Sequence, residues 1–326
     1  MQIKVEVAKS QPFLTKREIY MRYSGVGGQA VMEGVMMKNQ EKYAVAVRKP
    51  DQEIAIKVSE YKGIVQNKKI RNLPIVRGVL SFIESLYLGM STLTYSASFF
   101  EEEEDGKTPK EKTKKDEKKD AVIMGGTVAF SIVLALAIFF VLPYYLSGIF
   151  GRMIESSAVL ALVEGLIRLA IFIGYIALIS LMPDIKRVFM YHGAEHKCIN
   201  CIEHGMELNV ENVRKSSKQH KRCGTSFLFF ILIITIILTM FIRVDSRILR
   251  MVLRLAIIPV VAGISYEILR LAGRSENVIV NLVSKPGLWL QKLTTAEPDE
   301  EMIEVGIASV EAVFDWREYI KNLKEE

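Results

Sequence analysis

Four long apolar stretches dominate the pattern of hydrophobic and polar positions along the chain. They run over residues 121–147, 158–183, 225–242 and 248–271. About 20 consecutive apolar residues are enough for a helix to cross the hydrocarbon core of a bilayer. The pattern therefore predicts a mainly α integral membrane protein with about four transmembrane helices, two within residues 121–183 and two within 225–271.

The second and fourth stretches each carry two charged residues, whereas the first and third are nearly free of charge. Charged side chains at membrane depth usually pair with one another or face a protein interior. Glu164 and Arg168 in the second stretch are four residues apart, which places them on one helix face and predicts an ion pair. The fourth stretch carries Arg254 and Glu267, so both stretches are expected to be tilted, partly interfacial or packed inside a bundle.

The region before the apolar stretches, residues 1–72, predicts a small cytoplasmic β-rich region. The segments YAVAVRKP and EIAIKVSE alternate apolar and polar positions on either side of the turn-forming Pro50-Asp51-Gln52. This alternation is typical of a β-hairpin. A glycine-rich segment, GVGGQAVMEGVMMKNQ, precedes it and becomes strand-like.

Three further segments complete the expected organisation. Residues 73–100 predict an amphipathic or re-entrant helix at the membrane surface; a fifth span interrupted at Gly89 is the alternative, but it would reverse the side on which the N-terminus lies. Residues 101–120 are a run of mixed charges and predict a solvated linker. Residues 272–326 predict a cytoplasmic C-terminal tail, with an amphipathic helix after the acidic start at Glu297-Pro298-Asp299.

Composition and charge agree with a membrane location and indicate an orientation. Half of the residues are hydrophobic and the net charge is +6. Lysine and arginine are concentrated in 107–119 and 184–224, and cytoplasmic segments are enriched in these residues. We therefore expect a multi-pass protein of the cell (inner) membrane, with both termini and the 184–224 loop in the cytoplasm. The lipid bilayer is the expected partner; no basic patch interleaved with aromatic residues indicates nucleic acid.

All four histidines and all three cysteines lie between His192 and Cys223. The first pattern in this segment is His192-Gly193-Ala194-Glu195-His196, which has the H-x-x-E-H spacing of inverted zinc proteases. On a helix the two histidines share a face and can hold a divalent metal, while Glu195 acts as the catalytic base on a water. Gly193 is a weak helix former and counts against the helix.

The second pattern is Cys198-x2-Cys201-x18-His220-x2-Cys223, whose two closely spaced pairs are typical of a structural zinc site. Only Lys197 separates His196 from Cys198, so two separate ions do not fit easily. A single Zn2+ site, or one for another divalent transition metal, is the alternative; it would use the two helical histidines with His220 or Cys223.

Glu267 is an additional candidate ligand or second carboxylate. The predicted topology places it near the cytoplasmic end of the fourth span, level with the 184–224 segment. The alternative is an ion pair with Arg270, three residues later on the same helix.

Six segments together resemble one bacterial membrane family, called domain of unknown function 1385, whose members are labelled predicted metal-dependent enzymes. They are GGQAVMEGVMMK (27–38), LPIVRG (73–78), YHGAEHK (191–197), KRCGTSF (221–227), ISYE (264–267) and LTTAEP (293–298). The resemblance covers nearly the whole chain.

The resemblance also implies which residues matter. Its firm positions match His192, Glu195, His196, Arg222 and Cys223, with a histidine nearby that matches His220, whereas Cys198 and Cys201 match less firmly. It therefore favours a single metal site. It also gives weight to the glycine-rich stretch, where Gln29 and Glu33 would be substrate-binding groups on a backbone that approaches a ligand closely; a tight turn leading into a strand is the alternative.

Three functions remain open from the sequence. The first is a metal-dependent hydrolase that acts on a lipid-linked substrate or on a peptide presented at the membrane. The second is a non-enzymatic scaffold or assembly factor, in which zinc clips the 184–224 loop and other regions bind a protein partner. The third is a transporter, suggested only by the charges in the second and fourth stretches.

Overall fold

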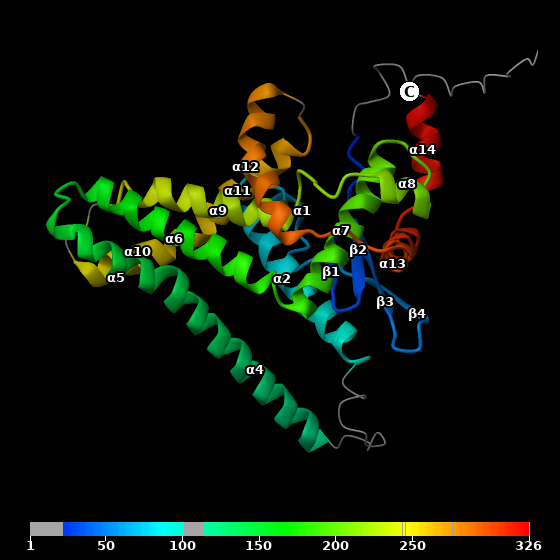
Figure 1. The fold of residues 1–326 in the computed structure, drawn as a ribbon, viewed down its shortest axis with the longest axis horizontal. Coiled ribbons are helices and arrows are strands. Elements are labelled where there is room, and N and C mark those ends of the chain that lie inside the picture. The colour runs from blue at the N-terminus through cyan, green and yellow to red at the C-terminus, as the bar shows by residue number, and fades with distance from the viewer. Residues whose placement is uncertain (1–21, 101–113, 243, 245, 276, 326) are drawn as a thin grey trace, which may run out of the picture.

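The computed structural model describes residues 22–100, 114–242, 244, 246–275 and 277–325. Figure 1 shows two regions. On one side a small sheet packs with α7 (Pro183–Glu203), α8 (Val210–Lys215), α13 (Glu300–Glu311) and α14 (Trp316–Glu325). The other side consists of long apolar helices, and α2 (Val76–Ala97), α11 (Ile258–Ala272) and α12 (Val278–Thr294) lie between the two regions.

The sheet is a four-stranded antiparallel meander in the order β1-β2-β3-β4. Its strands are β1 (Val26–Val31), β2 (Gly34–Asn39), β3 (Lys42–Arg48) and β4 (Ile54–Glu60). The predicted hairpin is confirmed as β3 and β4, whose last pair is Arg48 with Ile54. Gln52 in its turn adopts a φ of 71°, a left-handed conformation that a tight turn requires.

One face of the sheet and α13 enclose α7 in the main hydrophobic core. Val35 and Met37 of β2, Ile199 and Ile202 of α7, and Met302 of α13 are almost completely buried there. The amphipathic helix expected in the C-terminal tail is therefore α13, and its apolar face covers this core. As a result α7, which carries the H-x-x-E-H motif, is held from several sides.

Three helical segments are long and apolar enough to cross a membrane, namely Gly125–Arg152, Ser157–Ile179 and Ile248–Ala272, judged by length and composition among the described residues. They comprise parts of α4 (Lys114–Leu136), the π-helical turn η2 (Ala137–Val141), α5 (Leu142–Ile149), η3 (Phe150–Arg152), α6 (Ser157–Ile179), α10 (Arg247–Ala256) and α11. Apolar side chains such as Phe130, Val133 and Leu178 point outward and are exposed. This outward apolar surface is compatible with a membrane protein.

The predicted count of four spans is wrong for the third stretch. This stretch forms α9 (Gly224–Thr239), which has 16 residues and is a shorter apolar helix. Since a helix rises 1.5 Å per residue, α9 is about 24 Å long, whereas the hydrocarbon core is about 30 Å thick. The helix begins at Gly224, one residue before the predicted start, and ends at Thr239, so the shortfall lies at its C-terminal end.

Three of the four charges noted in the second and fourth apolar stretches form one buried network. Arg168 donates to Glu164 at 2.8 Å, which confirms the predicted pair along α6. Arg254 of α10 donates to the other oxygen of Glu164, so that the charges of the second and fourth stretches meet. These buried charges therefore serve to pack the helices against one another.

The remaining segments agree with their sequence expectations only in part. The helix expected within residues 73–100 is α2, which packs against α11 and β1 and, as expected, is not among the candidate spans; the short α1 (Lys68–Arg71) precedes it. Of the expected linker, residues 101–113 lie outside the described part, and 114–120 already belong to α4. The expected loop 184–224 is largely helical, because α7 extends through the motif to Glu203 and α8 follows.

Candidate metal centre

Helix α7 places His192 and His196 one turn apart on the same face, with their ring centroids 4.4 Å apart. Pro183 stands at the start of the helix, where it costs no hydrogen bond. The packing explains why glycine occupies position 193 between the histidines, because a Cβ atom there would lie 2.1 Å from the carbonyl oxygen of Ala296. The glycine that weakened the helix prediction thus lets the chain after α12 approach the motif closely.

Backbone carbonyls orient both imidazole rings. Nδ1 of His192 lies 2.9 Å from the Thr294 carbonyl oxygen, and Nδ1 of His196 lies 2.7 Å from that of Lys218. Since a carbonyl oxygen only accepts hydrogen bonds, each Nδ1 is the protonated nitrogen and donates. In the neutral rings each Nε2 then has a free lone pair, which is how metal-binding histidines are commonly oriented.

Cys223 completes a group of three candidate ligands. The ligand atoms of His192, His196 and Cys223 all lie within 4.8 Å of one another. Cys223 caps the N-terminus of α9, and its Sγ accepts a hydrogen bond from the Thr225 backbone N–H and lies 3.3 Å from His192 Nε2. Burial raises the pKa of this thiol, but the adjacent His192 and His196 together lower it well below its usual value.

The donor set fits a transition metal such as zinc. Two imidazole nitrogens and a thiolate are ligands that zinc prefers, and the thiolate is the form that binds metal. His196 and Cys223 are buried, and the His192 side chain is 18% exposed. The structure therefore brings His192, His196 and Cys223 together as a candidate metal site.

Glu195 lies directly beside this group. Its Oε2 is 3.4 Å from His196 Nε2 and 3.9 Å from His192 Nε2, and the side chain is buried. Strand β1 covers it, since a Cβ atom at Gly28 would lie 2.9 Å from Glu195 Cγ. Glu195 is thus close enough to act on a molecule bound between the three ligands, or to become a fourth ligand itself.

His220 lies next to the group but has other partners. Its ring centroid is 5.7 Å from that of His196, and its Nε2 lies 3.4 Å from Glu203. Gln291 holds its backbone by accepting from His220 N–H and donating to His220 C=O. Burial lowers the pKa of His220. Among the two alternatives for the third ligand, the geometry favours Cys223.

Glu203 ties His220 to Arg222 and to the start of the sheet. It accepts hydrogen bonds from Arg222 at 2.5 Å and from the Ser24 hydroxyl at 2.7 Å. Burial raises the pKa of Glu203, but the interactions with His220 and Arg222 outweigh it and lower the pKa to about 2. Glu203 is therefore ionised at neutral pH.

Cys198 and Cys201 lie apart from the candidate ligands. Both are completely buried in the core between α7, α8 and α13, and Cys198 Sγ lies against Gly306 of α13. The Cys201 thiol donates to the Glu207 carbonyl oxygen at 3.3 Å. Burial raises the pKa of both thiols, so they stay protonated and behave as small apolar side chains.

The remaining predicted residues are also engaged elsewhere. Glu267 pairs with Arg77 of α2 rather than with Arg270 or the metal group. Gln29 donates to the Thr92 hydroxyl of α2 at 2.9 Å. Glu33 occupies the turn between β1 and β2 with a φ of 47°, and its carboxylate pairs with Arg187 of α7. Glu33 therefore lies in the tight turn given as its alternative, Gln29 belongs to strand β1, and Glu267 has Arg77 as its partner in place of the expected Arg270.

Sequence reasoning missed the groups that position the ligands. Lys197 and Asn200 donate to four backbone carbonyls between Arg214 and Gln219, which fastens this segment to α7 and fixes the Lys218 carbonyl oxygen. The other carbonyl comes from Thr294, within the LTTAEP segment. A backbone carbonyl leaves no residue-type signal. Gly193 and the LTTAEP segment were the features that could have indicated this contact, but the sequence analysis did not connect them.

Comparisons with known proteins agree on the family. The family described as "Protein of unknown function (DUF1385)" matches residues 73–316. The "Uncharacterized protein YqhQ" of Bacillus subtilis (strain 168) is 35% identical over 291 residues, which cover 87% of this chain and 90% of that protein. No solved structure matches.

Neither description names a metal or an activity, so the expected label "metal-dependent enzyme" gains no support from these relatives. The family match spans both the metal-site segments and the apolar helices, and the relative is similar over nearly its whole length. The chain therefore belongs to the DUF1385 family of proteins of unknown function.

Proposed function

We propose that the protein is a zinc-dependent hydrolase of the cell membrane whose site opens at the cytoplasmic face. The observation that carries the proposal is the group of three candidate ligands with a carboxylate beside it. Three protein ligands and one open position are typical of catalytic zinc sites, whereas structural sites use four.

Each residue has a distinct role in this proposal. His192, His196 and Cys223 would hold the ion, which when bound would lower the pKa of a water toward 7 and polarise a carbonyl or phosphoryl oxygen. Glu195 would accept the proton of the attacking water and later return it to the leaving group. The carbonyls of Thr294 and Lys218 keep the imidazole rings aimed at the ion.

The location of the site supports a membrane-associated substrate. Cys223 is the N-cap of the apolar helix α9, while the two histidines belong to the helix that packs on the sheet. The site thus lies where the apolar helices meet the sheet region, as Figure 1 shows for α7 and α9. A lipid-linked molecule or a peptide presented at the membrane would reach this position.

A second function, a scaffold with a structural zinc, is favoured by one observation. Because Glu195 Oε2 lies within 4 Å of both imidazole Nε2 atoms, a small shift would make it a fourth ligand and close the site. The two functions differ in whether an outside ligand can reach the metal.

Cobalt substitution distinguishes them. The full-length protein in detergent would be loaded with Co2+, and its visible absorption followed during titration with azide. An open position predicts that azide changes the spectrum of the wild type, and that Glu195→Gln keeps the metal but loses hydrolysis of any substrate found by screening. Glu211→Gln, on the exposed surface of α8, is the matched control. If azide does not change the visible spectrum of the wild type but does change that of Glu195→Gln, the scaffold is favoured.

A further inference from the structure

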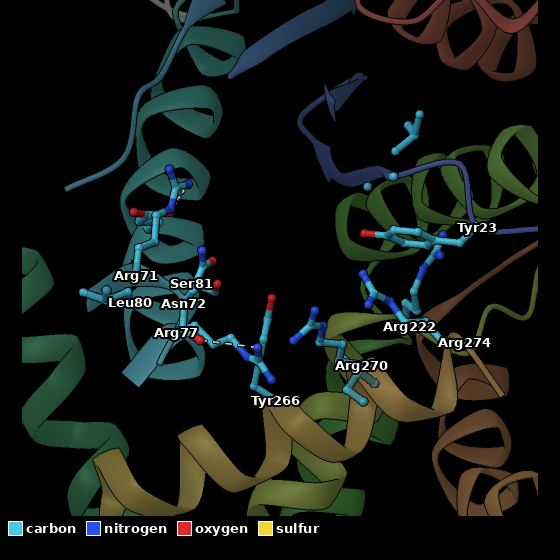
Figure 2. Close-up of a pocket in the computed structure, with 15 residues that line it drawn as sticks. Tyr23, Arg71, Asn72, Arg77, Leu80, Ser81, Arg222, Tyr266, Arg270 and Arg274 are labelled. Atoms are coloured by element: carbon cyan, nitrogen blue, oxygen red, sulfur yellow. Dashed lines mark hydrogen bonds and ion pairs between the residues drawn. The ribbon is translucent and has the colours of Figure 1, made fainter. Parts of the chain in front are cut away.

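A cavity of about 400 Å³ lies where α1, α2 and α11 approach the start of the sheet. Figure 2 shows that arginines line it on opposite sides. Arg71 and Arg77 lie on one side, on α1 and α2, whereas Arg222, Arg270 and Arg274 lie on the other. Glu84 is the one acidic residue among the described residues of the lining.

The charges around this cavity do not balance. Arg71 lies 3.7 Å from Glu84, Arg77 pairs with Glu267, and Arg222 pairs with Glu203. Arg270 and Arg274 have no carboxylate within ion-pair distance among the residues that the structure describes. Five arginines thus face three carboxylates, which leaves an excess of two positive charges.

One donor in the cavity wall is buried without a partner. Nη1 of Arg222 is inaccessible and has no hydrogen-bond partner within the described part of the chain. The Tyr23 ring lies between two guanidinium groups, with that of Arg222 4.3 Å and that of Arg274 5.1 Å from its centroid. A buried donor left unpaired is costly, so the Arg222 guanidinium is not fully satisfied by the described residues.

The cavity continues into a second one of about 380 Å³, which also includes Gly27, Arg71 and Ser81 and adds Lys38. Favourable interaction of cations with the C-terminal end of α11 explains Arg270 alone. It does not explain why Arg71, Arg77 and Arg222 converge from three other segments on the same space. The convergence indicates a binding site.

We propose that this arginine cavity binds a phosphate group. Guanidinium groups present paired N–H donors that match phosphate oxygens, and several of them converge here. Arg270 and Arg274 lie at the end of the candidate span Ile248–Ala272, the level at which lipid headgroups are found. The phosphate is therefore carried by an anionic lipid headgroup or by a soluble molecule, and both present the same chemistry to the arginines.

Thermal unfolding of the full-length protein in neutral detergent separates the two sources. The probes are dioctanoyl phosphatidic acid, dioctanoylglycerol, which has the same chains without phosphate, and inorganic phosphate. A rise in Tm with phosphatidic acid alone identifies a lipid. A rise at similar concentrations of inorganic phosphate identifies a soluble ligand. Equal rises with phosphatidic acid and dioctanoylglycerol, or no rise with any probe, overturn the proposal.

Substitutions locate the binding. Arg270→Gln/Arg274→Gln removes the two arginines without a carboxylate partner, so the fold should persist, and the Tm without ligand checks this. Two charge-assisted hydrogen bonds correspond to a loss of affinity of about 100-fold. Arg214→Gln/Arg317→Gln, two exposed arginines of α8 and α14, should bind as the wild type does. Unchanged affinity in the first double variant would also overturn the proposal.

Discussion

The metal centre and the arginine cavity lie on either side of the same two short segments and present opposite chemistry. In β1, Gly27 lines the cavity while Gly28 lies against Glu195 beside the metal centre. Before α9, Arg222 lines the cavity while Cys223 faces the two histidines. In β1 adjacent residues of the extended chain face opposite directions. Arg222 lies in a turn directly before the N-cap residue Cys223, and this turn separates the two side chains.

The two places also differ in how their polar groups are satisfied. In the metal centre each imidazole already donates one hydrogen bond, and lone pairs converge, which suits a cation. In the cavity N–H donors converge and exceed their carboxylate partners, which suits an anion. In each of these two segments, about one residue therefore separates a cation site from an anion site.

The largest effect should come from removing the histidine ligands. We expect His192→Ala/His196→Ala to reduce bound zinc from about one ion per chain to almost none, since two of three ligands are lost. His204→Ala is the control on the same helix, because His204 Nδ1 bonds only to the Asn200 carbonyl oxygen. Mass spectrometry of metal content decides. Equal loss in the control variant would mean that the centre has been misplaced.

Glu203 separates the two places, so its removal should affect stability but not metal content. Glu203→Gln leaves Arg222 and His220 without their ionised partner, and we expect a loss of about 3 kcal/mol in the free energy of unfolding. Glu211→Gln, in an exposed pair with Lys215, should leave the free energy of unfolding almost unchanged, because solvent screens surface ion pairs. Chemical denaturation with parallel zinc analysis measures both. Zinc lost together with Glu203 would show that His220 belongs to the metal centre.

Gly193→Ala tests the close approach that orients His192. The new methyl group would push away the segment after α12, and we expect a loss of about 2 kcal/mol in stability, with weaker zinc binding because the Thr294 carbonyl moves. Gly174→Ala in α6 meets open space, and should be neutral or stabilising by up to about 1 kcal/mol. Thermal unfolding compares them. A Gly193→Ala variant as stable as the wild type would disprove the contact.

Cys198→Ala should have the smallest effect. It removes a buried sulfur from the core against Gly306, and we expect a loss of about 1 kcal/mol without loss of zinc. Denaturant unfolding of the zinc-loaded protein provides the measurement. Zinc lost from the Cys198→Ala variant, measured in parallel, would instead show that Cys198 is a ligand.

The sequence predicted what depends on local spacing. The alternation around Pro50 predicted the β3–β4 hairpin, the four-residue spacing predicted the Glu164–Arg168 pair, and the motif placed the two histidines on one helix face. Spacing along the chain could not predict which residues that are far apart in the sequence come into contact in the fold. The short spacing of Cys198 and Cys201 suggested a zinc clip, yet on a continuous helix both thiols enter the core, Cys198 against α13 and Cys201 toward the Glu207 carbonyl oxygen.

The misjudged length of the third apolar stretch has a related cause. Hydrophobicity alone extended it to Ile242, but Cys223 fixes where α9 begins, and the helix ends at Thr239. The carbonyls of Thr294 and Lys218 could not be predicted either, because they depend on how α12 and the 214–219 segment pack on α7.

One measurement distinguishes the metal centre from the zinc clip suggested by the cysteine spacing. It is the zinc content per chain of Cys223→Ala and of Cys201→Ala, each as full-length protein in detergent. Both variants remove one buried thiol, and only Cys223 lies with His192 and His196. We expect Cys223→Ala to lose most of the zinc and Cys201→Ala to keep about one ion per chain. Zinc retained in Cys223→Ala and lost in Cys201→Ala would contradict the centre described here.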